Sequence, residues 1–390
     1  MDEMSTSRIL KTLKRRVLGA SRSCGLFSLS MGSEWRRRRL LILSYHGISL
    51  QDEHEWNPKS FMSPQDFERR MTLLARHKCH VLPLHEGIKL LYSNRLPERS
   101  VALTFDDGNY DFYRQAWPIL QKHRIAATVY LTTFYKERPM PVWPQICSYM
   151  LWKQRLHTAD FTGLPGLQGP VMLHTSEARA DLVDILDREA IRQGLTAEDK
   201  NKVASKLADR IGLDYGALTA QRILQIMTSA EVADIASHGV DIQLHTHRHR
   251  TPLDAGLFRR EISDNRHAIE QITNAPALHF CYPNGHYQPE FIPWLSSEGV
   301  ASATTCDAGL ASPSSPSLLL PRLVDHSGLS DVEFEGWLCG VSAVLPRRDK
   351  VQQHSLRHAG RVTAPPSGPT TVKTTAFEFA ERLVGSVRES

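Results

Sequence analysis

The 390-residue sequence contains no closely spaced pair of cysteines. Its six cysteines lie far apart, at positions 24, 79, 147, 281, 306 and 339. This spacing excludes a C-x-x-C metal or redox motif and a compact disulfide framework. Unpaired thiols in a reducing compartment are the simplest interpretation of such a pattern.

The N-terminal region also lacks an apolar run long enough to cross a membrane. The stretch 26–31 is short and rich in serine, whereas a membrane-spanning helix needs about 20 apolar residues. Basic residues interrupt the apolar positions between 9 and 18, which is not the pattern of a secretory signal. We therefore expect a cytoplasmic protein, at most peripheral to the inner face of the membrane.

The chain has little net positive charge outside its N-terminus. Residues 1–40 hold ten lysines or arginines and three acidic residues, whereas the rest of the chain has 37 basic and 39 acidic residues. We interpret residues 1–39 as a basic arm with apolar residues at helical spacing, which packs on the body of the protein or makes peripheral contact with an anionic membrane surface. Only Trp35 is interleaved with its charges, so we expect no nucleic-acid partner.

From residue 40 onward, short apolar strands alternate with amphipathic helices. Such alternation is typical of a parallel sheet with helical crossovers, and it predicts an α/β fold that closes, or nearly closes, into a barrel over residues 40–345. We count seven or eight strands, expected at 40–43, 80–82, 101–105, 127–131, 241–244, 278–282, 301–305 and 318–320.

Two regions depart from this alternation. Residues 139–225 begin with proline, glycine and tryptophan and continue as a helical tract, which we interpret as an insertion between two strands of the barrel. Residues 346–390 are rich in Pro, Thr, Ser, Arg and Lys and have little apolar surface to bury. We predict that this C-terminal tail is disordered.

Two adjacent carboxylates follow the strand at 101–105. Asp106 and Asp107 come where this strand ends, and Gly108 gives the backbone the freedom to turn there. In this position one carboxylate can hold a cation while the other moves protons. A solvated Asp-Asp-Gly turn is the alternative interpretation of these residues alone.

A histidine cluster follows the strand at 241–244. His245 and His249 are four residues apart, and two imidazoles with one carboxylate leave an open position on a divalent ion, as at catalytic zinc sites. His46, Asn284 and Arg322 also follow predicted strands. Because the carboxyl ends of parallel strands in a barrel meet at one rim, we expect these side chains to converge.

The order of these motifs resembles the polysaccharide deacetylase family, the NodB-homology carbohydrate esterases. The resemblance is carried by T-F-D-D-G at 104–108 and H-T-x-x-H at 245–249, with further similarity at S-Y-H-G (44–47) and F-C-Y-P-N-G (280–285). It covers roughly residues 40–340. It implies a distorted, NodB-like (β/α) barrel, one divalent metal (usually Zn²⁺, with Co²⁺, Ni²⁺ or Mn²⁺ as alternatives), and hydrolytic removal of N- or O-linked acetyl groups from a carbohydrate.

The resemblance also implies roles for individual residues. Asp107, His245 and His249 would be the metal ligands, and Asp106 would be the general base that deprotonates a metal-activated water. The implied substrate is an N-acetylated sugar, polymeric or lipid-linked.

The sequence departs from the family pattern in its later motifs. Cys281 stands where the family usually has an arginine that orients the base. We predict that Arg322 replaces it by binding Asp106 bidentately from a neighbouring strand end, the alternative being a rim arginine in solvent. His326 is a loose match to the histidine that supplies the general acid, and we assign it that role.

Two other classes of function remain open. One is a barrel that binds glycan without turning it over, and the other is a scaffold at a membrane surface. The intact Asp-Asp and His-His pairs argue against both, because a protein that only binds has no need of an open metal position.

Overall fold

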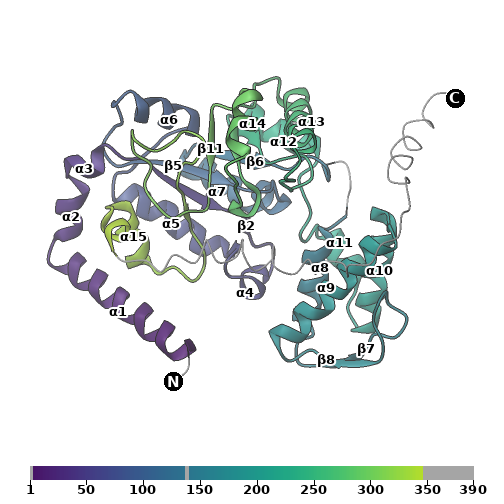
Figure 1. Cartoon of the computed structure of the whole chain (residues 1–390). Coiled ribbons are helices and arrows are strands. Elements are labelled where there is room, and N and C mark those ends of the chain that lie inside the picture. The colour runs from purple at the N-terminus through teal and green to yellow at the C-terminus, as the bar shows by residue number, and fades with distance from the viewer. Residues whose placement is uncertain (1–2, 137–139, 346–390) are drawn as a thin grey trace, which may run out of the picture. The chain divides into compact units, whose positions relative to one another are not determined.

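A parallel β-sheet forms the centre of the computed structural model, which describes residues 3–136 and 140–345 (Figure 1). The strands hydrogen-bond in the order β11-β10-β9-β6-β5-β1-β12, with β4 also paired to β5, and every pair in this sheet is parallel. This arrangement confirms the predicted α/β barrel-like fold. The strands are β1 (Leu41–Tyr45), β4 (His80–Val81), β5 (Ser100–Phe105), β6 (Thr128–Leu131), β9 (Asp241–Leu244), β10 (His279–Cys281), β11 (Ser302–Thr304) and β12 (Leu323–Val324).

The last strand differs from its predicted position at 318–320. In that segment Leu320 makes a single parallel bridge to Thr304 of β11, and the strand β12 begins three residues later, where Leu323 pairs with Leu43 of β1. Pro321 lies between them and has no N–H to continue a ladder. The chain therefore changes partners at this proline, from one edge of the sheet to the other, and so brings the two edges together.

Helices alternate with the strands, as the pattern predicted. Their first turns carry the expected caps: Ser63 accepts a hydrogen bond from the Asp66 N–H, and Thr228 forms a capping box with Glu231. These helices are α5 (Pro64–Arg76), α6 (Leu84–Tyr92), α7 (Trp117–His123) preceded by a π-helical turn (Phe112–Ala116), α12 (Ser229–Ser237), α13 (Ala255–Thr273), α14 (Phe291–Ser297), α15 (Asp331–Leu338) and α16 (Val341–Val344).

The segment between β1 and α5 is more regular than its polar sequence suggested. It contains the short helix α4 (Glu53–Trp56), and the two-residue strands β2 (Gly47–Ile48) and β3 (Phe61–Met62) pair in parallel beside it. The strands of this small sheet follow directly on the carboxyl end of β1 and therefore help to form the rim on which the site lies.

Residues between β6 and β9 build a region with its own apolar core. Phe161, Leu182 and Leu207 are buried in this core and belong to a cluster separate from that of the sheet. A short antiparallel hairpin accompanies the helices. The elements are α8 (Trp143–Lys153), β7 (Thr158–Asp160), β8 (Pro170–Met172), α9 (Ser176–Arg192), α10 (Ala197–Arg210) and α11 (Tyr215–Ala220).

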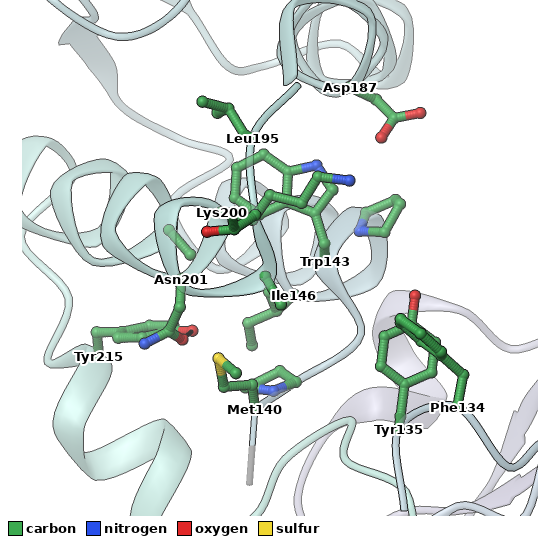
Figure 2. A pocket seen from close by; sticks show the side chains of 15 residues that line it. Phe134, Tyr135, Met140, Trp143, Ile146, Asp187, Leu195, Lys200, Asn201 and Tyr215 are labelled. Carbon is green, nitrogen blue, oxygen red and sulfur yellow. Dashed lines mark hydrogen bonds between the residues drawn. The ribbon is translucent and has the colours of Figure 1, made fainter. Parts of the chain in front are cut away.

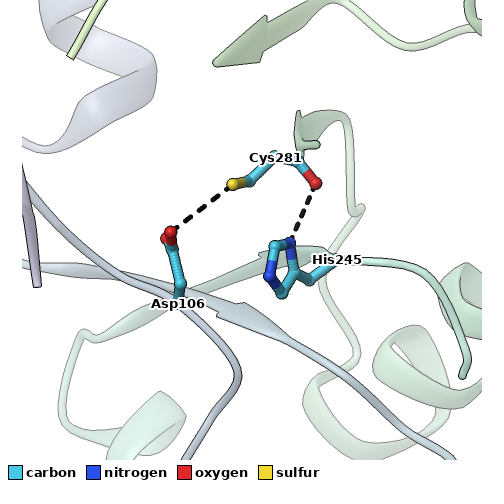
Figure 3. A group of neighbouring side chains, drawn as sticks. All are labelled: Asp106, His245 and Cys281. Carbon is cyan, nitrogen blue, oxygen red and sulfur yellow. Dashed lines mark hydrogen bonds between the residues drawn. The ribbon is translucent and has the colours of Figure 1, made fainter. Parts of the chain in front are cut away.

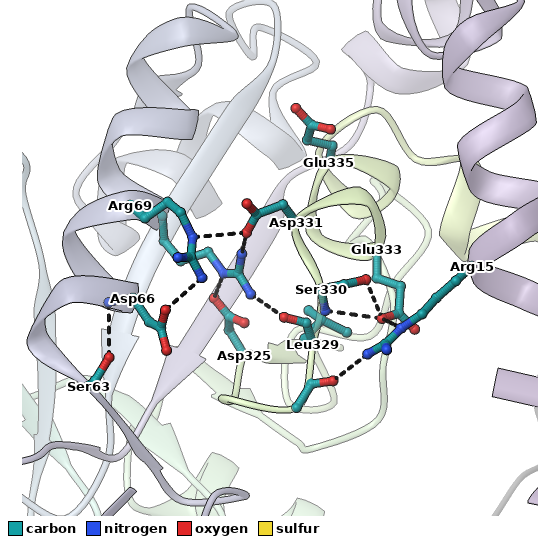
Figure 4. Close-up of polar contacts among 12 residues, drawn as sticks. Arg15, Ser63, Asp66, Arg69, Asp325, Leu329, Ser330, Asp331, Glu333 and Glu335 are labelled. Atoms are coloured by element: carbon teal, nitrogen blue, oxygen red, sulfur yellow. Dashed lines mark hydrogen bonds and ion pairs between the residues drawn. The ribbon is translucent and has the colours of Figure 1, made fainter. Parts of the chain in front are cut away.

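The basic N-terminal segment is helical and lies against α15. It consists of α1 (Glu3–Ser23), α2 (Leu26–Met31) and α3 (Glu34–Arg37). Arg15 Nε lies 2.9 Å from Glu333 Oε2 (Figure 4), Arg22 Nη1 lies 2.6 Å from Glu335 Oε2, and Leu18 between them is fully buried. Part of the basic excess is therefore used in packing this segment on the body.

Within residues 3–136 and 140–345, no helix combines the length and the hydrophobicity needed to cross a bilayer. The predicted disordered tail, residues 346–390, lies outside the described residues, so that expectation stays a prediction.

Candidate active site

The two carboxylates after β5 are held by a tightly bonded turn. The Asp106 N–H donates to the Tyr45 carbonyl, extending the β1–β5 ladder by one step, and the Gly108 N–H donates back to the Asp106 carbonyl. The carbonyl of Asp107 accepts hydrogen bonds from both the N–H and the hydroxyl of Thr132, after β6. The turn is thus bonded to both neighbouring strand ends, so the two carboxylates have fixed positions.

Backbone strain is present both in this turn and in the histidine loop. Asp107, Thr246 and His249 have φ values of 73°, 62° and 53°, in the left-handed region that side chains other than glycine seldom adopt. Gly108 has a φ of 82°, and a Cβ there would overlap Leu131. Strained residues of this kind are often found where a site must place its side chains in one arrangement.

Asp107, His245 and His249 converge on one point. His245 Nε2 lies 3.3 Å and His249 Nε2 lies 3.2 Å from Asp107 Oδ1. This oxygen is buried and has no hydrogen-bond partner among the described residues. Burial alone would raise the pKa of Asp107, but His249 and His245 hold it well below its usual value.

This donor set fits a divalent cation. The buried Asp107 oxygen requires a positive partner, and the Nδ1 of His245 lies 2.9 Å from the Cys281 carbonyl. If Nδ1 carries the proton in this bond, the Nε2 lone pair points toward Asp107, and an outer carbonyl commonly orients a metal-binding histidine in this way. Two imidazole nitrogens and one carboxylate match the ligand preference of zinc and leave a position open.

Two buried polar residues on α13 hold the histidine loop. Asn265 accepts a hydrogen bond from the His245 N–H at 2.9 Å and donates to the Leu131 carbonyl. Glu261 accepts from the Arg248 N–H at 2.8 Å and pairs with the Arg250 side chain at 2.7 Å. The sequence analysis did not include either residue.

A signal for these two residues was present in the sequence. Glu261 and Asn265 are four residues apart on a helix whose buried face also carries Phe258, Ile262 and Ile269. Polar side chains on an apolar helical face need partners on the element that the face covers. That element is β9, the strand whose carboxyl end leads into the histidine loop.

Arg322 binds Asp106 through two parallel hydrogen bonds, which is the geometry predicted from the sequence. Its Nη1 lies 2.7 Å from Oδ1 and its Nη2 lies 2.8 Å from Oδ2. Both side chains are buried, and the Arg322 Nε donates to the Thr305 carbonyl. Burial favours the neutral acid, but the charge of Arg322, aided by His46 and His245, lowers the pKa of Asp106 to about 2.

Cys281 lies beside this ion pair, and Figure 3 shows its thiol directed toward Asp106. Its sulfur is 3.6 Å from Asp106 Oδ2 and 3.1 Å from Arg322 Nη2. Asp106, His245 and Cys281 form a second group with metal-ligating atoms near one another. Burial raises the pKa of the Cys281 thiol well above its usual value, and both Asp106 oxygens are bound to Arg322, so this group is a poorer ligand set than that of Asp107.

A cavity of about 320 Å³ opens at the convergence point. Its lining includes Asp107, His249 and Asn284 together with His46, which follows β1. His46 Nε2 is 3.8 Å from Asp106 Oδ2. The S-Y-H-G motif therefore contributes a site residue to which the sequence analysis gave no role.

His326, the predicted general acid, does not belong to the lining of this cavity. Its Nδ1 accepts a hydrogen bond from the Gly328 N–H at 3.0 Å, within its own turn. His326 lies two residues after β12, which ends at Val324, in the loop leading to α15. The assignment of His326 stays a sequence prediction that the geometry does not support.

Comparison with known proteins addresses the family directly. The sequence profile of the polysaccharide deacetylase family matches residues 93–303, more than half of the chain. The chain belongs to the polysaccharide deacetylase family. The match begins before β5 and ends in β11, so it contains both the Asp-Asp turn and the histidine loop.

Curated relatives align over shorter stretches. The poly-beta-1,6-N-acetyl-D-glucosamine N-deacetylase of Staphylococcus epidermidis is 36% identical over 110 residues, 26% of this chain and 38% of the relative. The enzyme of the same description from Staphylococcus aureus is 35% identical over 72 residues, 18% of this chain and 25% of the relative. The chain thus matches less than half of the length of either relative.

Two solved structures of the family share the fold. The Streptococcus pyogenes deacetylase PplD in complex with acetate aligns with a TM-score of 0.50 and 18% identity, covering 79% of this chain and 99% of that one. IcaB from Ammonifex degensii aligns with a TM-score of 0.50 and 15% identity, covering 77% and 97%. At these identities the likeness concerns the fold alone.

Proposed function

We propose that this chain is a metal-dependent hydrolase that removes N-linked acetyl groups from a carbohydrate, with O-linked acetyl groups as the alternative substrate. The observation that carries the proposal is the meeting of Asp107, His245 and His249 around one buried carboxylate oxygen, which has no hydrogen-bond partner in the part of the chain that the structure describes. Membership of the polysaccharide deacetylase family and the names of the curated relatives support the substrate class.

A divalent cation held by Asp107, His245 and His249 would polarise the acetyl carbonyl and lower the pKa of a coordinated water from about 16 to about 7. In this proposal Asp106 accepts the proton of the attacking water. This role is supported by its position directly before Asp107 on the same turn and by its carboxylate, which lies within 4.8 Å of the ligand atom of His245. Arg322 holds this carboxylate ionised and in one orientation through its two hydrogen bonds.

We further propose His46 as the group that protonates the leaving nitrogen. Its imidazole lines the cavity with Asp107 and His249, and its Nε2 lies 3.8 Å from Asp106. A general acid must lie within hydrogen-bond reach of the leaving atom. His46 lines the cavity with two of the proposed metal ligands and so meets this requirement better than His326, which is not part of the lining.

The test is metal content measured together with acetate release. We expect about one divalent ion per chain and release of acetate from N-acetylated sugars. His245→Ala should abolish both metal binding and hydrolysis, whereas His238→Ala, a change at an exposed histidine on α12, should change neither. Full metal occupancy in His245→Ala would refute the ligand assignment, and a metal-loaded protein that releases no acetate from any sugar would favour a glycan-binding barrel.

A further inference from the structure

A second cavity, of about 420 Å³, lies in the segment between β6 and β9 (Figure 2). We call it the insertion cavity. Phe134 and Tyr135, from the loop after β6, form one side. Residues of α8, α9, α10 and α11 and of the loops before α8 and α10 form the remainder, among them Trp143, Lys200 and Tyr215. Its volume lies within the range of about 300–1,000 Å³ that is usual for small-molecule sites.

The insertion cavity adjoins the active-site cavity. Pro144, in the first turn of α8, lines both of them, while its neighbour Trp143 lines the insertion cavity and its neighbour Gln145 lines the active-site cavity. The two cavities therefore share a wall residue at the start of α8.

The aromatic side of the insertion cavity is connected to the histidine loop. The Phe134 N–H donates to the His247 carbonyl at 2.8 Å, and the two rings meet edge to face with centroids 5.6 Å apart. His247 lies between the two histidines of the H-T-x-x-H motif. The wall of the insertion cavity and the metal-binding loop are thus parts of one bonded unit.

The lining combines aromatic rings with a few polar groups. Tyr135, Trp143 and Tyr215 offer ring faces, and Asp187, Lys200 and Asn201 offer a carboxylate, an ammonium and an amide. Asn201 Oδ1 accepts the hydroxyl proton of Tyr215, which leaves the amide NH₂ group as its donor for a ligand. One charge of each sign makes the cavity suited to a neutral, hydrogen-bonding molecule.

Sugar rings have this chemistry, with an apolar face of C–H groups and an edge of hydroxyls. Aromatic faces pack on the former, and carboxylate, ammonium and amide groups bind the latter. An acyl chain would instead desolvate Asp187, Lys200 and Asn201 without offering them partners, which costs free energy. The cavity therefore favours a glycan over a lipid tail.

We propose that the insertion cavity binds sugar units of an extended glycan while one N-acetylated unit of the same chain occupies the active-site cavity. The inference rests on the proposed function and narrows its substrate from any N-acetylated sugar to an oligomer or polymer. The insertion then serves as the element that selects for chain length.

The experiment compares hydrolysis of the N-acetylglucosamine monomer, dimer and longer oligomers, in β-1,4 and β-1,6 linkage. The cavity is filled by Ala197→Trp, at the start of α10, and the matched control is Ala180→Trp, at an exposed position of α9 outside the lining. We expect Ala197→Trp to lower the ratio of kcat/KM for long oligomers to that for the monomer by about tenfold, the scale of one lost anchoring contact. Ala180→Trp should keep the wild-type ratio.

Binding separates this inference from the proposed function. Calorimetric titration of the longer oligomers into Asp106→Asn protein, with and without Ala197→Trp, reports the insertion cavity even if no substrate is hydrolysed. Weaker binding in the filled variant supports the inference. Equal binding of the longer oligomers by the two proteins overturns it, and so does an equal loss of kcat/KM for all chain lengths. Saturable binding of a fatty-acid probe also overturns it if Ala197→Trp abolishes that binding while oligomer binding is unchanged.

Discussion

Two buried arginine–aspartate pairs lie at the strand ends of this protein, and the pKa values of their carboxyl groups are shifted in opposite directions. Arg322 binds Asp106 after β5, and Arg70 binds Asp325 after β12, with all four residues at most 4% exposed. The pKa of Asp106 is lowered to about 2. Burial raises the pKa of Asp325 to about 6, although Arg70 and Tyr45 act in the opposite direction.

The number of bonds to each carboxylate explains the difference. Both oxygens of Asp106 are bonded to Arg322. Arg70 meets only the Oδ2 of Asp325, at 3.0 Å, and donates its other groups to Asp331 and to the Leu329 carbonyl. The second oxygen of Asp325 is buried without a hydrogen-bond partner among the described residues. Figure 4 shows Asp325, Asp331 and Leu329, the residues to which Arg70 donates, close to one another.

The comparison teaches that a buried arginine does not by itself keep a carboxylate charged. A bidentate pair does so because both lone-pair directions are filled, whereas a shared cation leaves part of the desolvation cost uncompensated. The first arrangement suits a base that must stay ionised in the active site. The second suits a structural junction between α5, β12 and α15.

The largest difference between the pairs should appear when each aspartate is neutralised. Asp106→Asn should lower kcat by about 10²–10⁴-fold, the range of general-base catalysis, while metal content stays near wild type because Asp106 is not a ligand. Asp325→Asn should lower kcat by less than about tenfold. Steady-state rates and metal analysis on both variants provide the check, and loss of the metal from Asp106→Asn would make Asp106 a ligand.

The histidine next to each pair offers a second large contrast. His46 lies 3.8 Å from Asp106, and His326 directly follows Asp325. If His46 is the proton donor, His46→Gln should lower kcat by about 10²-fold or more, whereas His326→Gln should lower it by only a few fold. The reverse result would restore the role that the sequence predicted for His326.

Exchanging each arginine for lysine should separate activity from stability. An ammonium keeps the charge but lacks the planar fork, so Arg322→Lys should lower kcat by about tenfold or more through a misoriented Asp106. Arg70→Lys should leave kcat near wild type and lower the free energy of unfolding by about 1.5–3 kcal/mol, the scale of a lost charged hydrogen bond. Rates and urea unfolding of both proteins test this, and a wild-type rate for Arg322→Lys would contradict it.

The smallest effect concerns the pH dependence of stability. Because the folded-state pKa of Asp325, about 6, lies above its ordinary value of 3.8, the folded protein binds this proton more tightly than the unfolded chain does. The contribution of Asp325 to stability is therefore greatest below pH 4 and falls by at most about 3 kcal/mol as the pH rises to about 6.

Urea unfolding between pH 4 and pH 7 measures this contribution as the difference between wild type and Asp325→Asn. Asp331→Asn is the matched control, because Asp331 also pairs with Arg70 but its side chain is 41% exposed. We expect the slope of the unfolding free energy against pH to differ from wild type in Asp325→Asn but not in Asp331→Asn. A difference that stays constant with pH would show that Asp325 is ionised throughout this range.

The sequence by itself determined the strands that end in functional residues. Asp106, Asp107 and His245 each follow an apolar strand, and Arg322 follows the apolar segment 318–320, whose Leu320 bridges Thr304 of β11. Parallel strands carry their carboxyl ends to one rim, so the sequence predicted that these four side chains converge. The bidentate Arg322–Asp106 pair was predictable for the same reason, since a long guanidinium at one strand end reaches a carboxylate at another.

Three features depend on tertiary contacts and could not be predicted from the sequence. They are the histidine that lines the active-site cavity, the polar residues that hold the histidine loop, and the position of the insertion cavity. His46 and His326 both follow strands of the sheet, but of these two only His46 lines the active-site cavity. Glu261 and Asn265 are 11 to 20 residues from the loop residues that they bind. The physical reason is common to all three: local sequence sets the direction of a strand or helix face, but the partner of a buried polar side chain depends on which distant element packs against it.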